Sequence, residues 1–299
     1  MINFRKIELS DKVIIDSCLA ENTFRACDYC FTNLFSWQLL FKTSFDVIDE
    51  TLFIRGIDNE NNFFYMMPIG KMPLKNALFL IMEDAKKNNV PLKMKGITTR
   101  MSLCVEKAMP DTFQYSHDRE NDEYIYFTQK LIELKGKKLQ SKRNHINRFK
   151  ADNPNWTYST INSGEELKEC IRMLDKWESL NIDNDNSETF NHDYIATKTM
   201  IENFSALQLS GGIIRIKEEI IAFTLGEKLT EDTFVIHVEK AFGEINGAYA
   251  IVNQQFAENV AYEYTYINRE EDMGLENLRK AKMSYQPDII LEERILTLK

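Results

Sequence analysis

The stretch from Thr233 to Tyr266 constrains the fold most, because it reads as a strand, a loop, a helix and a second strand. Its first seven residues alternate between apolar and mixed side chains, which is typical of a strand. After Gly247, apolar residues recur at helical spacing, and the last residues are again strand-like. Two strands joined through one helix indicate a right-handed parallel crossover.

The loop of this crossover is a candidate ligand site. Asn246 and Gly247 can adopt backbone angles that other residues avoid, and the free N–H groups at a helix start attract phosphate or carboxylate groups. Lys240 adds a positive charge. We therefore predict donor or cofactor binding by Lys240, Asn246, Gly247 and Ala248. An ordinary strand-to-helix turn is the alternative.

The chain has 299 residues, which exceeds what one hydrophobic core usually serves, so we expect two domains. Each half shows helices, then short strands, then a helix and a further strand. This order predicts an α+β protein with two mixed, mostly antiparallel sheets flanked by helices. We place an N-terminal domain at 1–130, a basic linker helix at 131–155 and a C-terminal domain, which carries the candidate site, at 156–299.

Residues 135–150 form a basic segment without any acid, in a chain whose net charge is -9. Apolar residues near one helical face predict a helix between the domains. Its cations, Lys142 and Arg143 among them, fit an anionic partner: a tRNA acceptor stem, a nucleotide or lipid headgroups. A solvated linker helix is the alternative.

Composition excludes several classes of protein. No run of about 18 apolar residues could span a bilayer, and the first residues lack an apolar signal region, so we expect a cytoplasmic protein without an integral membrane segment. The five cysteines are odd in number and scattered, which disfavours a disulfide framework. Cys27 and Cys30 have redox or half-zinc spacing, but no second pair completes a metal site, so we expect no metal.

The order of elements in each half is that of the Gcn5-related acyltransferase fold. Three motifs, 142–149, 238–241 with 247–249, and 268–287, resemble the bacterial family related to the C-terminal domain of phosphatidylglycerol lysyltransferase. Members of that family resemble tandem acyltransferase-fold domains, as do the Fem aminoacyltransferases. The resemblance implies transfer of an acyl or aminoacyl group from a coenzyme A thioester or an aminoacyl-tRNA to an amine or hydroxyl acceptor, which is a small molecule or a lipid.

Such a transfer needs a base, a stabilised oxyanion and a proton for the leaving group. His237 and Glu239 lie on one face of the predicted strand, and either could be the base. Tyr285 is similar in position to the tyrosine that protonates the leaving thiolate in many acyltransferases of this fold. Core packing is the alternative role for each. The loop departs from the usual acyltransferase pattern because Glu244 would repel a phosphate, which argues against coenzyme A.

A polar turn directly follows the second strand of the crossover, where strand ends commonly open onto a site. It consists of Asn268, Arg269, Glu270, Glu271 and Asp272. We expect Asn268 and Arg269 to contact substrate, with Arg269 on a carboxylate or phosphate and Glu271 or Asp272 on an ammonium. A salt-bridge cluster that organises the turn is the alternative.

Two further functions stay open beside the enzyme. One is a non-catalytic binding module of the same fold that recognises an anionic metabolite, nucleic acid or lipid headgroup. The other is an adaptor that binds RNA or a membrane surface through residues 135–150. The sequence does not determine the oligomeric state.

Overall fold

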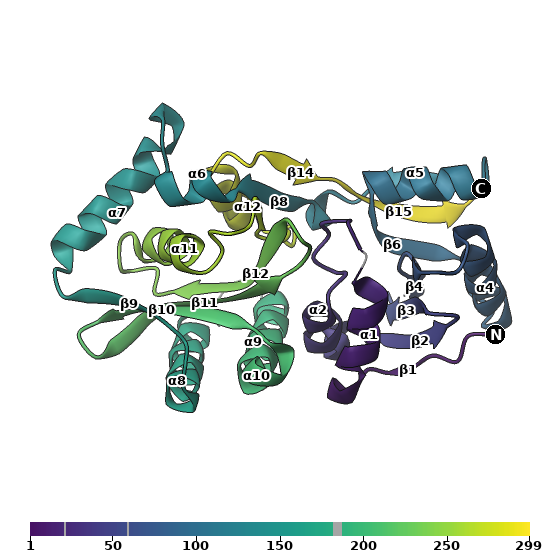
Figure 1. Ribbon diagram of the computed structural model, residues 1–299, viewed down its shortest axis with the longest axis horizontal. Coiled ribbons are helices and arrows are strands. Elements are labelled where there is room, and N and C mark those ends of the chain that lie inside the picture. Colours follow the sequence, from purple (N-terminus) through teal and green to yellow (C-terminus); the bar gives the residue numbers. More distant parts are fainter. Residues whose placement is uncertain (21, 59, 182–186) are drawn as a thin grey trace. The chain divides into compact units, whose positions relative to one another are not determined.

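The computed structural model describes residues 1–20, 22–58, 60–181 and 187–299 (Figure 1). The chain divides into two compact units. The first contains Met1–Glu123, Glu271–Leu275 and Ile290–Lys299, and the second contains Tyr124–Glu270 and Glu276–Ile289. Each unit is a mixed, mostly antiparallel sheet with helices packed on it, as expected from the order of elements.

The first sheet has the strand order β1-β2-β3-β4-β6-β15-β7, with β5 paired to β3. β4 and β6 pair in parallel, and the other neighbouring strands of this sheet are antiparallel. Its strands are β1 (Arg5–Lys6), β2 (Ser44–Ile48), β3 (Thr51–Ile57), β4 (Phe63–Tyr65), β5 (Ile69–Gly70), β6 (Lys93–Thr98), β7 (Phe113–His117) and β15 (Glu293–Leu298). Its helices are α1 (Lys12–Leu19), α2 (Phe31–Ser36), α3 (Gln38–Phe41), α4 (Leu74–Lys87) and α5 (Thr99–Ala108).

The second sheet has the order β14-β8-β13-β12-β11-β10-β9. Its strands are β8 (Glu123–Phe127), β9 (Trp156–Thr160), β10 (Ser210–Ile216), β11 (Glu219–Lys228), β12 (Thr233–Ala241), β13 (Tyr266–Asn268) and β14 (Ile289–Leu291). Its helices are α6 (Thr128–Glu133), α7 (Gln140–Asp152), α8 (Gly164–Asn181), α9 (Ser187–Glu202), α10 (Phe204–Leu207), α11 (Ala248–Asn259) and α12 (Glu276–Met283). In Figure 1, α11 and α7 lie on one side of this sheet, and α8 and α9 lie on the other.

The predicted crossover is confirmed. β12 and β13 pair in parallel over only three residues each, from Thr233 with Tyr266 to Val235 with Asn268, and α11 joins them. Beyond Val235, β12 continues to Ala241 while β13 has ended, so Glu239 lies past the paired part of the strands. The second strand is shorter than the expected 262–267 run, because the chain makes a turn before Tyr266.

The two sheets have equivalent strand orders when the first is counted from β1 and the second from β9. In each sheet, the strand next to the last one comes from the other half of the sequence. β15, at the end of the chain, lies between β6 and β7, whereas β8, which follows β7, lies between β13 and β14. The expected domain boundaries differ accordingly: 290–299 belong to the first unit. The consecutive strands β7 and β8 belong to different sheets.

The basic segment is helical, as expected, but it is part of the second unit rather than a separate linker. Its apolar residues Ile146 and Phe149 are buried, and α7 packs on α11. Ser163 and Glu166 form a capping box: the Ser163 hydroxyl accepts from the Glu166 N–H at 3.2 Å, and the Glu166 carboxylate accepts from the Ser163 N–H at 3.0 Å. This box opens α8.

Candidate functional site

The candidate site lies in the second unit, where β12 continues past the end of β13. Arg269, directly after β13, pairs with Glu239 of β12: its Nε and Nη2 atoms lie 2.8 and 2.6 Å from Glu239 Oε2. Asn253 of α11 donates to the other oxygen, Oε1, at 3.0 Å. Glu239 is therefore bound both by Arg269 of the turn and by Asn253 of α11.

Two aromatic rings enclose the guanidinium of Arg269. Its central carbon lies 4.7 Å from the ring centroid of Tyr285 and 5.7 Å from that of Tyr126, and the two rings meet edge to face. Burial is the largest influence on the pKa of Arg269 and would lower it, but Glu239, Tyr126 and Tyr285 together outweigh burial, and the pKa is raised. Arg269 is therefore a permanent buried cation.

Two polar atoms in this cluster remain unused. Among the residues that the structure describes, Arg269 Nη1 and Asn253 Oδ1 are both buried and lack a hydrogen-bond partner. One is a donor and the other an acceptor, and both flank Glu239. Leaving such atoms unpaired costs about 1–3 kcal/mol each. This pair therefore points to a ligand that offers an oxygen to Arg269 and an N–H or O–H group to Asn253.

Lys142 of α7 lies on Tyr285. Its ammonium is 4.2 Å from the centroid of the tyrosine ring. Burial, and secondly the charge of Arg269, lower the pKa of Lys142 to about 8, while Glu239 opposes the shift. A substantial fraction of Lys142 is therefore neutral near physiological pH and can accept a proton.

Tyr285 follows α12 and is buried. Burial raises the pKa of its hydroxyl to about 12, although Arg269 lowers it. Tyr285 therefore keeps its proton at neutral pH and can donate it. The resemblance singled out this residue, and the structure places it against Arg269 and Lys142.

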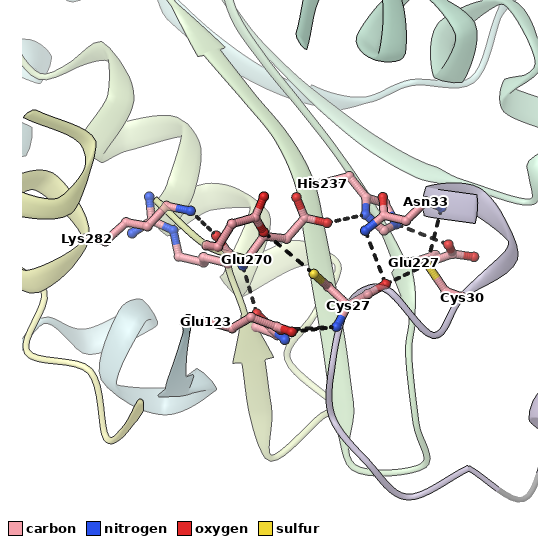
Figure 2. A network of polar contacts seen from close by, with 11 residues as sticks. Cys27, Cys30, Asn33, Glu123, Glu227, His237, Glu270 and Lys282 are labelled. Carbon is pink, nitrogen blue, oxygen red and sulfur yellow. Dashed lines mark hydrogen bonds and ion pairs between the residues drawn. The ribbon is translucent and has the colours of Figure 1, made fainter. Parts of the chain in front are cut away.

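His237 occupies a different environment from Glu239, although the two lie on the same strand. Figure 2 shows it beside Glu227 and Glu270; Nδ1 lies 2.8 Å from Glu270 Oε1 and Nε2 lies 3.1 Å from Glu227 Oε1. Both ring nitrogens are engaged, so the expected role of His237 as a catalytic base does not fit this geometry. Burial lowers its pKa, but the two glutamates outweigh burial and raise it to about 9.

The loop between β12 and α11 does not have the open structure expected of a ligand site. The Lys240 side chain is buried, forms an ion pair with Asp193 of α9 and lies 4.0 Å from the Trp177 ring centroid. At Gly247, a Cβ atom would lie 2.4 Å from the His145 carbonyl oxygen of α7, so the helix start is closely covered there. The sequence could not show this contact, which joins segments about 100 residues apart.

The remaining predicted loop residues are engaged within the second unit. Asn246 Oδ1 lies 2.8 Å from His145 Nδ1. Ala248 is buried, and its N–H donates to the Ile245 carbonyl at 3.1 Å. These contacts leave the start of α11 packed against α7 rather than presented as an open phosphate cradle.

The other predicted substrate residues have structural partners. Asn268 is buried and its side chain accepts from the Glu270 N–H at 2.7 Å. Asp272, in the first unit, is fully buried and accepts from Arg119 at 3.3 Å. Arg143 donates to the Leu134 and Gly136 carbonyls, so it caps the end of α6.

Glu271, the last of the predicted substrate residues, lies in the first unit. Its carboxylate is 3.8 Å from Cys27 Sγ, and the Cys27 N–H lies 3.1 Å from both oxygens of Glu123. Figure 2 shows Glu123 beside Cys27. Sequence reasoning missed Asn253 of α11 and Tyr126 of β8, because no motif marks either residue.

Comparison with known proteins now gives the chain its relatives. The family model described as phosphatidylglycerol lysyltransferase, C-terminal, matches residues 21–295. A conserved protein of unknown function from Bacteroides thetaiotaomicron is 41% identical, with a TM-score of 0.93 over 100% of both chains. The structure of L-PGS from Bacillus licheniformis is 15% identical, with a TM-score of 0.63 over 88% of this chain and 86% of that one. The latter likeness shows the fold.

A curated relative is more distant. An uncharacterised protein from Mycoplasmoides gallisepticum is 24% identical over 178 residues. The match covers 58% of this chain and 55% of the relative, so the chain spans about half of that protein. Separately, within the residues that the structure describes, no helix has the length and apolar character needed to cross a bilayer.

Proposed function

The chain belongs to the family of the phosphatidylglycerol lysyltransferase C-terminal domain, and we propose that its second unit transfers an aminoacyl group from an aminoacyl-tRNA ester to a hydroxyl or amine acceptor. One observation carries the proposal: the buried, unused pair Arg269 Nη1 and Asn253 Oδ1 lies beside a lysine of lowered pKa and a protonated tyrosine. Together these groups supply what acyl transfer needs.

The proposed reaction assigns a role to each group. Neutral Lys142 takes the proton of the acceptor hydroxyl or amine, whose oxygen or nitrogen forms a bond to the ester carbonyl carbon. Arg269 Nη1 donates to the oxyanion that develops. The bond from the carbonyl carbon to the ribose oxygen then breaks, and Tyr285 gives its proton to that oxygen. The proton on Lys142 restores the Tyr285 hydroxyl through solvent.

The covered start of α11 favours an ester donor over a coenzyme A thioester. Acyl-coenzyme A needs exposed helix-start amides for its pyrophosphate. Here the His145 carbonyl lies against Gly247, and Glu244 adds a negative charge to the loop. Exposed cations of the basic segment, such as Lys138 and Arg148, support a polyanionic donor such as tRNA.

The test measures transfer of radiolabelled amino acid from total aminoacyl-tRNA to lipid vesicles and to soluble amines, beside acyl-coenzyme A as an alternative donor. Tyr285→Phe should slow transfer about 100-fold and leave donor affinity within about twofold, because only the proton donor is lost. Arg269→Lys should reduce the rate by about 100- to 1,000-fold, since the oxyanion donor is lost.

Lys217→Met is the matched control, because Lys217 is exposed in the turn between β10 and β11 and lies outside both the cluster and the basic segment. Binding of aminoacyl-tRNA without any turnover would instead identify a non-catalytic binding module. Equal loss of binding and turnover in Tyr285→Phe would contradict the role given to the tyrosine.

A further inference from the structure

His237 of β12 is held between two carboxylates and takes no part in the proposed reaction. Each ring nitrogen lies within hydrogen-bond distance of a glutamate oxygen, at 2.8 Å for Glu270 and 3.1 Å for Glu227. An ionised carboxylate can only accept, so both ring nitrogens must donate. His237 is therefore an imidazolium, and the side chain has no exposed surface.

Its partner Glu270 has an unusual backbone. Its φ is 57°, in the left-handed region that residues with a Cβ atom rarely adopt. This conformation costs roughly 1 kcal/mol in a residue other than glycine. Three contacts offset that cost: the Asn268 side chain accepts from the Glu270 N–H at 2.7 Å, the Tyr124 N–H donates to the Glu270 carbonyl at 3.2 Å, and His237 holds the carboxylate.

Glu270 directly follows Arg269, whose backbone is also fixed. The Arg269 N–H donates to the Tyr124 carbonyl at 3.0 Å, and its own carbonyl accepts from the Lys282 ammonium at 2.5 Å. Two residues of β12 thus hold consecutive residues of the turn: Glu239 holds the Arg269 side chain, and His237 holds Glu270.

We propose that His237 is a positioning residue that clamps Glu270 in its left-handed conformation and thereby fixes Arg269 with Nη1 directed at the ligand. This inference rests on the proposed function only in taking Arg269 as the ligand-binding group. Without the clamp, Glu270 relaxes toward ordinary backbone angles. Arg269 then loses the position in which Glu239 binds its Nε and Nη2 atoms and Nη1 is available to the ligand.

A double-mutant cycle tests the clamp in the full-length chain. Glycine adopts the left-handed region without strain, so Glu270→Gly removes the need for a clamp. His237→Gln alone should lower the transfer rate at least 10-fold with less than a twofold change in donor affinity. The double variant should instead retain at least half the rate of Glu270→Gly. His192→Gln is the matched control.

Nuclear magnetic resonance gives a readout that does not depend on activity. The chain has four histidines, so single His→Gln variants assign each imidazole. At pH 7.5 both ring nitrogens of His237 should carry protons. The Arg269 Nε–H signal, protected by Glu239, should broaden or shift in His237→Gln, remain in His192→Gln and return in the double variant.

Three results would overturn the inference: a neutral His237 at pH 7.5, an unchanged Arg269 signal in His237→Gln, or an effect of His237→Gln that Glu270→Gly does not suppress. Failure of the proposed function looks different. If the wild-type chain transfers nothing while the Arg269 signal still depends on His237, the clamp stands and the transferase does not.

Discussion

Lys142 couples the stability of the second unit to its proposed chemistry. Its pKa is about 8 in the folded chain and 10.5 in its unperturbed state, so the unfolded state binds more protons between these values. Folding therefore carries a penalty that is fully present below about pH 8 and declines as the pH rises toward 10.5. A group kept at such a cost is a functional candidate.

Replacing Lys142 by Met should separate stability from activity. At pH 7 the variant should melt a few degrees higher than the wild type, because the buried charge is gone, and the difference should vanish near pH 10.5. Thermal melting from pH 6 to 10.5 measures this, with Lys138→Met as the exposed control. Parallel curves for the wild type and Lys142→Met would contradict the lowered pKa.

The lowered pKa of Lys142 also predicts how the transfer rate depends on pH. Below about pH 8 the wild-type rate should rise about tenfold per pH unit, since only neutral Lys142 accepts a proton, and it should level off above that value. In Lys142→Met the residual rate should lack this rise. Initial rates of the wild type and of Lys142→Met, measured from pH 6 to 9 with saturating donor, test this prediction.

For single residues, the sequence predicted which ones belong to the candidate site better than it predicted their roles. Arg269, Tyr285, Glu239 and Lys142 were all predicted, and the structure brings them together. His237 looked equivalent to Glu239 because the two alternate on one strand. Their partners differ: Glu227 of β11 and Glu270 contact His237, whereas Asn253 of α11 and Arg269 contact Glu239. No local pattern encodes those contacts.

Secondary structure elements were predictable where a local signal fixes them. The alternation in β12 and the helical spacing after Gly247 indicated the crossover. The packing of α7 on α11 was not predictable. It depends on a glycine at the contact, because Gly247 has a φ of 85° and touches the His145 carbonyl.

Gly247→Ala should therefore cost more than the strain of a positive φ. The added Cβ would lie 2.4 Å from a backbone oxygen that cannot move without shifting α7, so we expect destabilisation by about 2–3 kcal/mol or more. Gly243→Ala in the same loop meets nothing within 4 Å and should cost far less. Urea unfolding of both variants gives the comparison, and equal costs would contradict the close packing of α7 on α11.

At the scale of the whole molecule, the exchange of strands sets the limits of sequence reasoning. Both halves have the same order of elements, which suggested two contiguous domains. Strand pairing between β15 and β6 joins residues almost 200 positions apart, from Glu293 with Thr98 to Thr297 with Lys93. Composition and periodicity are local properties, so they cannot report which sheet a strand enters.

The position of β15 between β6 and β7 predicts which fragments of the chain fold. A fragment of residues 1–130 lacks β15, so β6 and β7 lose the strand between them and an inner edge of the first sheet is exposed. Joining Met1–Glu123 to Glu292–Lys299 through a short glycine–serine linker should restore it, because Asp122 accepts from the Glu293 N–H at 3.0 Å and the ends to be joined are therefore close. The joined fragment should melt cooperatively and protect the amides of β6 in hydrogen exchange, whereas 1–130 should not. Cooperative melting of 1–130 alone would show that the first unit does not need its exchanged strand.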